Sequence, residues 1–89
     1  MSGKYENESE ALFMGMVSSF VTNGLINLGE QINPLTGKRT VNTAQATYSI
    51  KMLEMIKTKT NGNLSDNEDE MINSAVSKLK MRFVSVNEN

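Results

Sequence analysis

A short polar segment, residues 61–68, constrains the fold of this chain most, because it ends one helix and begins another. Gly62 can adopt the left-handed backbone conformation that closes a helix at little energetic cost. Ser65 and Glu68 have the spacing of a capping box, in which the serine hydroxyl accepts from the Glu68 N–H and the glutamate reaches back. A stop and a start this close together predict a helical hairpin.

The helix before this segment is predicted over residues 43–61. Asn42 is a favourable N-cap residue, and Gln45 follows three positions later, as in a capping box. One face of this helix collects Ala46, Ser49, Ile50, Leu53, Ile56 and Thr60. A weaker apolar patch is either a further packing surface or a half-exposed flank, and it comprises Ala44, Tyr48, Met52 and Met55.

The helix after the segment is predicted over residues 66–84. Its first turns are acidic and its last turns are basic, as the helix macrodipole favours. The i, i+3, i+4, i+7 spacing of an amphipathic helix predicts a buried face made of Ile72, Ala75, Val76, Leu79 and Phe83. The local signals and the global pattern therefore agree on the hairpin.

A longer first helix is predicted over residues 9–28, with Ser9 as its N-cap and Gly29 just past its end. At 100° per residue, one apolar arc covers more than half of the circumference, which is wider than the stripe of an ordinary surface helix. The arc comprises Leu12, Phe13, Met14, Met16, Val17, Phe20, Val21, Leu25 and Leu28.

The other side of the first helix is unusual because no charged residue occurs between positions 11 and 29. Its side chains are small or uncharged: Gly15, Ser18, Ser19, Thr22, Asn23 and Ile26. A solvated helix face normally carries charges, whereas small residues let another backbone approach closely. We therefore predict a homo-oligomeric helical bundle, in its simplest form a homodimer, with this helix at its centre. The candidates for the close crossing are Gly15, Ser18, Ser19 and Thr22.

The predicted fold is all-α, with three helices: a long first helix, a turn-rich linker over about residues 30–41, and a C-terminal helical hairpin. Residues 9–84 form the single domain, and we expect the polar tails, residues 1–8 and 85–89, to be disordered. A chain of 89 residues is marginal as an isolated domain, and small domains without disulfides often rely on oligomerisation.

The composition argues against several classes of function. The chain has no cysteine and no histidine, which removes thiolate chemistry and the commonest general base and metal ligand. A net charge of −1 gives no electrostatic basis for binding nucleic acid. The acidic, polar N-terminus lacks the basic start of a secretory signal, so we expect the protein to be cytoplasmic.

No group of residues predicts a catalytic, cofactor or metal site. Counted from Asn61 or from Asp66, the acidic run lacks the glycine and glutamate positions of a calcium-binding EF-hand loop. A phosphate-binding loop usually contains several glycines, whereas this segment has only Gly62. Of the carboxylates considered for catalysis, Glu54 lies on a polar helix face and Glu68 is explained as a cap. We therefore expect that the protein is not an enzyme.

The uncharged run, residues 11–29, approaches the roughly twenty residues that a membrane span needs. Its hydroxyl and amide side chains disfavour hydrocarbon, and no basic cluster or aromatic belt flanks it. Our leading interpretation is a small non-enzymatic structural or adaptor protein that binds itself, with another protein as a further candidate partner. The alternative is a membrane-associated accessory protein that uses the uncharged first helix.

Residues 59–65 followed by Glu68 form the most distinctive part of a longer pattern. The rest of the pattern comprises Phe13, Met14, Gly15, Val17, Ser19, Leu28, Gly29, Asn33, Pro34, Thr36, Gly37, Ala46, Ile50, Leu53, Leu79, Met81, Arg82, Phe83 and Val84. In these residues the chain resembles a small, mostly bacterial family classed only as a domain of unknown function, number 1844. Lys51 departs from that family, which usually has an acid at this place. The resemblance implies a short helical protein and carries no activity with it.

Overall fold

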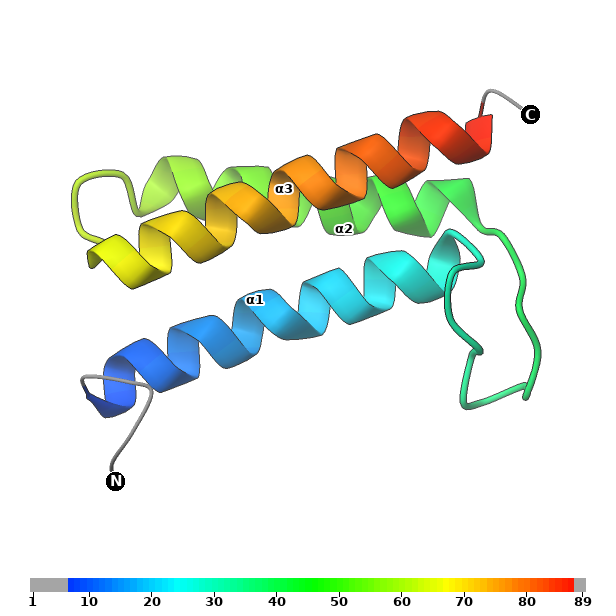
Figure 1. The fold of residues 1–89 in the computed structure, drawn as a ribbon, viewed down its shortest axis with the longest axis horizontal. Coiled ribbons are helices and arrows are strands. Elements are labelled where there is room, and N and C mark those ends of the chain that lie inside the picture. Colours follow the sequence, from blue (N-terminus) through cyan, green and yellow to red (C-terminus); the bar gives the residue numbers. More distant parts are fainter. Residues whose placement is uncertain (1–6, 88–89) are drawn as a thin grey trace.

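The computed structural model describes residues 7–87, and these form three α-helices. Helix α1 spans Glu8–Asn27, α2 spans Thr43–Lys59 and α3 spans Asp66–Asn87. Figure 1 shows α2 and α3 as an antiparallel hairpin, with α1 lying along it in the direction of α3. Every pair of helices is in contact, and residues 7–87 contain no strand, only isolated bridges in the loop between α1 and α2. The all-α prediction is confirmed.

Helix α1 starts one residue before its predicted start, and Asn7 caps it in place of Ser9. The Oδ1 atom of Asn7 accepts a hydrogen bond from the backbone N–H of Glu10 at 2.7 Å. Asparagine and serine are comparable N-caps, so both positions were open to this role on propensity alone. Capping at Asn7 places Glu8 and Glu10 in the first turn, where the positive end of the helix dipole favours acids.

The end of α1 is a Schellman motif, as the position of Gly29 predicts. Gly29 has a φ of +79°, the left-handed conformation that glycine adopts without strain. The Gly29 N–H donates to the Ile26 carbonyl at 3.1 Å, and the Glu30 N–H donates to the Leu25 carbonyl at 2.9 Å. These two bonds satisfy carbonyls that the end of the helix would otherwise leave open.

The predicted ends of all three helices need correction, and α1 ends at Asn27, one residue before its predicted end. Helix α2 ends at Lys59, before its predicted end at residue 61. Helix α3 continues to Asn87, so the disorder expected for residues 85–87, and for residues 7–8 at the other end, is wrong. The extra turn of α3 packs Val86 against the core, and this apolar contact explains why the helix continues. The predicted disorder of residues 1–6 and 88–89 lies outside the described residues.

The core lies where the three helices meet. Helices α2 and α3 bury the faces that their apolar spacing predicts, and Phe83 packs at the edge of the core. The second apolar patch of α2 is a half-exposed flank, since Tyr48 and Met55 are exposed and Met52 is partly buried. The buried apolar residues are Val17, Leu25, Leu28, Ala46, Ile50, Leu53, Ile56, Ile72, Ala75, Val76 and Leu79.

The apolar arc predicted for α1 is too wide. Leu12 is 67% exposed and Met16 is 40% exposed, because two helices of one chain cover only one side of α1. Most of the uncharged side of α1 also points away from α2 and α3, whereas its Asn23 turns toward α2 and donates from Nδ2 to the Ser49 hydroxyl at 3.5 Å. We define the outward face of α1 by the residues that point away from the hairpin. These residues are Leu12, Gly15, Met16, Ser18, Ser19, Thr22 and Ile26. All of them are exposed except Ile26, which is partly buried.

On the inner side, α1 packs closely against α3 at Gly24. A Cβ atom added at Gly24 would lie 2.9 Å from both terminal methyl carbons of Leu79, which is fully buried. Such a distance is too short for two carbon atoms in ordinary contact. Gly24 therefore allows the two helices to approach, a role that the sequence pattern does not reveal.

We expect Gly24→Ala to destabilise the protein by about 1–3 kcal/mol, because the new methyl group displaces Leu79 from its packed position. The matched control is Gly15→Ala, since a Cβ at Gly15 meets nothing within 4 Å. Alanine is the better helix former, so the control should gain up to about 1 kcal/mol. Urea unfolding of dilute protein measures both, and equal effects of the two changes would contradict the close packing.

Candidate functional site

A buried carboxylate joins the first turn of α1 to the loop between α2 and α3. Glu10 is only 2% exposed, although it belongs to the first turn of a helix. The Ser65 hydroxyl donates a hydrogen bond to Glu10 Oε2 at 2.6 Å, between residues that are 55 positions apart. This length lies within the normal range of O–H···O hydrogen bonds. The contact therefore ties α1 to the hairpin.

The same serine forms the predicted capping box of α3. The Ser65 Oγ atom accepts from the Glu68 N–H at 3.2 Å, and Glu68 Oε1 accepts from the Ser65 N–H at 2.8 Å. A hydroxyl has one proton to donate and lone pairs to accept with. Ser65 uses the proton for Glu10 and a lone pair for the start of α3, so one side chain serves two helices.

The surroundings of Glu10 explain why a carboxylate can be buried here. Burying a carboxylate is costly unless hydrogen bonds and favourable electrostatics replace water. Helices α1 and α3 both begin at this end of the molecule (Figure 1), so their positive dipole ends lie near the Glu10 side chain. Among the described residues, no buried side-chain nitrogen or oxygen lacks a hydrogen-bond partner. The group is therefore accommodated as part of the structure.

The chemistry that this arrangement supports is positioning. A general base must come within hydrogen-bond reach of the proton it removes from a substrate. The Glu10 carboxylate is enclosed, and the hydroxyl proton of Ser65 already lies between the two side chains. The geometry therefore favours a structural role for the Glu10–Ser65–Glu68 cluster, in which it holds three segments of the chain together.

Sequence reasoning missed Glu10 because this residue, although it lies inside the predicted first helix over residues 9–28, was given no part in the buried face. A signal was available, since Glu10 precedes Val17 by 7 residues and Leu28 by 18, and at 100° per residue these three positions share one direction. A lone carboxylate on the buried side of an amphipathic helix needs a partner elsewhere in the chain. The sequence alone does not say that Ser65 provides it.

The other polar candidates lie apart from this cluster. Glu54 Oε2 is 2.5 Å from Lys80 Nζ, in a surface ion pair between α2 and α3. Such exposed pairs contribute little to stability. On α2, the Asn42 Oδ1 atom accepts from the Gln45 N–H at 3.1 Å, which is the predicted N-cap. These residues support the helices individually and do not assemble into one site.

Gly62 is left-handed as predicted, with a φ of +88°, but its position differs from the prediction. Helix α2 ends at Lys59 with Thr60 as its C-cap. The Asn63 N–H donates to the Thr60 carbonyl at 2.9 Å, so Gly62 is the third residue of a turn that follows the cap. The turn redirects the chain toward Ser65 and the start of α3.

The four candidates for self-association all lie on the outward face of α1. Gly15, Ser18, Ser19 and Thr22 are exposed, and the Ser19 hydroxyl donates to the Gly15 carbonyl at 3.0 Å within the helix. The outward face also contains a shallow hollow of about 360 Å³. Its lining residues are Ser18, Ser19, Thr22 and Ile26, together with the neighbouring Asn23. The described chain thus leaves these candidates uncovered.

Two further features are absent from residues 7–87. In this part of the chain, no group of three or more acidic side chains is arranged to hold a metal ion. None of the three helices described combines the length and the apolar character that crossing a bilayer requires.

We expect Ser65→Ala to destabilise the protein by about 1–3 kcal/mol, because the change removes the cap and leaves the buried Glu10 carboxylate without this donor. Glu10→Ala should cost a similar amount. In a double-mutant cycle measured by urea unfolding, the two changes should couple by about 1–3 kcal/mol, as residues in direct contact do.

The matched control is Glu8→Ala, which removes an exposed acid from the same first turn. Combined with Ser65→Ala, it should give additive free energies within about 0.5 kcal/mol. Additive behaviour of the Glu10 and Ser65 changes would mean that the hydroxyl and the carboxylate do not stabilise each other.

Gly62→Val should destabilise the protein by roughly 1–2 kcal/mol through backbone strain, because a β-branched residue does not tolerate a positive φ. A Cβ at this position meets nothing within 4 Å, so crowding does not contribute. Gly62→Asn is the informative comparison, since asparagine tolerates the left-handed conformation and should cost less. Thermal or urea unfolding measures both variants, and an equal loss for the two would argue against a conformational cause.

Comparison with known proteins places this geometry in a family. The family model described as Domain of unknown function (DUF1844) matches residues 10–85, a range that includes Glu10, the turn at Gly62 and the capping box. No curated protein and no solved structure matches the chain. The match covers most of the 89 residues. The chain therefore belongs to this family of proteins with a domain of unknown function.

Proposed function

We propose that this protein is a small non-enzymatic structural or adaptor protein, which associates with a second copy of itself through the outward face of α1. The observation that carries the proposal is the exposure of this face. Leu12 and Met16 are exposed there beside small uncharged residues, whereas a helix face in water normally carries charged side chains.

The shape of the outward face supports close helix packing. A Cβ at Gly15 would meet nothing within 4 Å, so the backbone is open to an approaching chain at this point. Small residues at i and i+4, here Gly15 and Ser19, let two helix axes come near each other. An isologous contact, in which both copies use the same surface, is the commonest arrangement of homodimers.

The buried cluster at Glu10 supports the same proposal because it fixes α1 on the hairpin. An interface that is held in place before binding loses less conformational entropy on association. We regard another protein as a further candidate partner, and we assign the assembly to the cytoplasm because the chain uses no cysteine.

Sedimentation velocity at micromolar concentration tests the proposal. We expect a dimer for the unchanged protein and a monomer for Gly15→Leu, because the larger side chain prevents the close crossing. Circular dichroism should show the same helix content in both, since leucine is a good helix former.

The matched control is Ser77→Leu, which adds the same side chain at an exposed position of α3 and should leave the dimer intact. A monomer for the unchanged protein would refute self-association. A dimer that persists in Gly15→Leu would remove Gly15 from the interface.

A further inference from the structure

We infer that the two copies cross with their α1 helices antiparallel, so that the acidic start of each α1 lies against the basic loop of the other copy. This inference rests on the proposed self-association and adds to it the orientation of the partner and the charges that select it.

A continuous seam of residues runs along the outward face. Leu12, Gly15, Ser19, Thr22 and Ile26 are separated alternately by three and four residues, and at 100° per residue they lie within one narrow arc. This alternation is the spacing with which two helices pack side by side at a shallow angle. Glu8, one turn before Leu12, continues the seam and is exposed.

The two ends of the seam carry opposite charge. Glu8 lies at the start of α1, and the loop after α1 carries Lys38 and Arg39, all three exposed. Within residues 7–87 none of these three side chains forms an ion pair, whereas Glu30 of the same loop is 3.9 Å from Arg82 of α3. The unpaired charges of the loop are therefore its cations.

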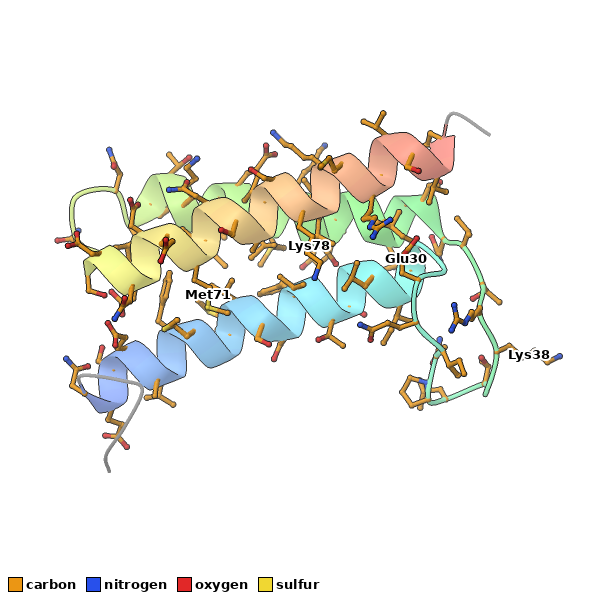
Figure 2. All side chains as sticks on the ribbon, in the orientation of Figure 1. Glu30, Lys38, Met71 and Lys78 are labelled. Carbon is orange, nitrogen blue, oxygen red and sulfur yellow. The ribbon has the colours of Figure 1, made fainter. Side chains whose placement is uncertain are left out.

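The loop between α1 and α2 lies at the end of the seam opposite Glu8. Figure 1 shows the segment between α1 and α2 extending past the end of α1 on the side away from the hairpin. Figure 2 shows Lys38 at the outer edge of this loop, pointing away from the helices. A second helix laid along the outward face therefore meets the loop at one of its ends.

The charges at the two ends of the seam determine whether the second α1 helix runs parallel or antiparallel to the first. A parallel pair places Glu8 beside Glu8 and the basic loops beside each other, which is repulsive at both ends. An antiparallel pair places Glu8 of each copy near the basic loop of the other. It also aligns the two helix dipoles in opposite directions, which is favourable. If the antiparallel helices cross between Ser18 and Ser19, Gly15 of one copy faces Thr22 of the other. In the same arrangement, Glu8 of one copy faces the start of the loop of the other.

A second copy is a suitable partner for this surface because the same chain carries the seam, the acidic start of α1 and the basic loop that would contact it. The seam between Leu12 and Ile26 is only about 21 Å long, at 1.5 Å per residue. Stable interfaces bury about 800 Å² on each partner, more than so short a seam provides. The loop, which extends past the end of α1 (Figure 1), adds exposed apolar surface: Leu35 is 92% exposed, and Ile32 and Val41 are exposed as well.

Cysteine cross-linking tests the orientation without background, because the chain contains no cysteine. We expect a disulfide-linked dimer when Leu12→Cys and Ile26→Cys are mixed and oxidised, and little from either variant alone. In an antiparallel pair, two copies of the residue at position 12 lie about 20 Å apart, well beyond the reach of a disulfide. Efficient self-linking of Leu12→Cys would overturn the antiparallel orientation.

Ser19→Cys separates this failure from that of the proposed function. Position 19 is near the centre of the seam, so it should self-link in either orientation if the outward faces meet. If Ser19→Cys links and the mixed pair does not, self-association stands and the orientation is wrong. If no variant links and sedimentation gives a monomer, both proposals fail.

Charge exchange tests the ends of the seam. Glu8→Lys, or Lys38→Glu together with Arg39→Glu, should each raise the dimer dissociation constant by about tenfold at low salt, and by less at high salt. Combining all three changes in one chain should restore dimerisation, since the pairs are reversed together. The control Glu70→Lys alters an exposed acid of α3 and should have no effect. Failure of the combined variant to recover would exclude the cross-copy charge contact.

Discussion

The structure depends on one hydroxyl group, that of Ser65, which lies between two glutamates. It accepts from the N–H of Glu68 and donates to the carboxylate of Glu10. The first bond defines where α3 begins, and the second defines where α1 lies against the hairpin. Because a buried carboxylate without a donor is costly, the position of α1 is specified more sharply than apolar contact alone would specify it.

Helix α1 has two sides with different demands on its small residues. On the inner side, Gly24 has no room for a methyl group because Leu79 fills the space. On the outward side, Gly15 has room to spare within one chain. Glycine therefore permits close packing against α3 at position 24 and leaves the helix surface open at position 15. Only the three-dimensional arrangement distinguishes the two cases.

Much of the fold follows from the sequence, and what does not follow depends on contacts between distant residues. The three helices, the faces of α2 and α3, and the capping box of Ser65 and Glu68 depend on local spacing, and the structure contains them. The buried role of Glu10 depends on a partner 55 residues away. The end of α3 depends on Val86 reaching the core, and the exposure of Leu12 depends on how far α2 and α3 extend around α1.

The sequence separation of the Glu10–Ser65 bond has a consequence for the order of folding. The hairpin of α2 and α3 needs only a short loop, so its contacts form at low entropic cost. Docking of α1 requires closure of a far longer stretch of chain and a linker without regular structure. We therefore expect α1 to be the last helix to join and the first to detach. Once detached, this helix has no charge between residues 11 and 29 to oppose its aggregation, so we expect the hydrogen bond that holds it in place to limit aggregation as well.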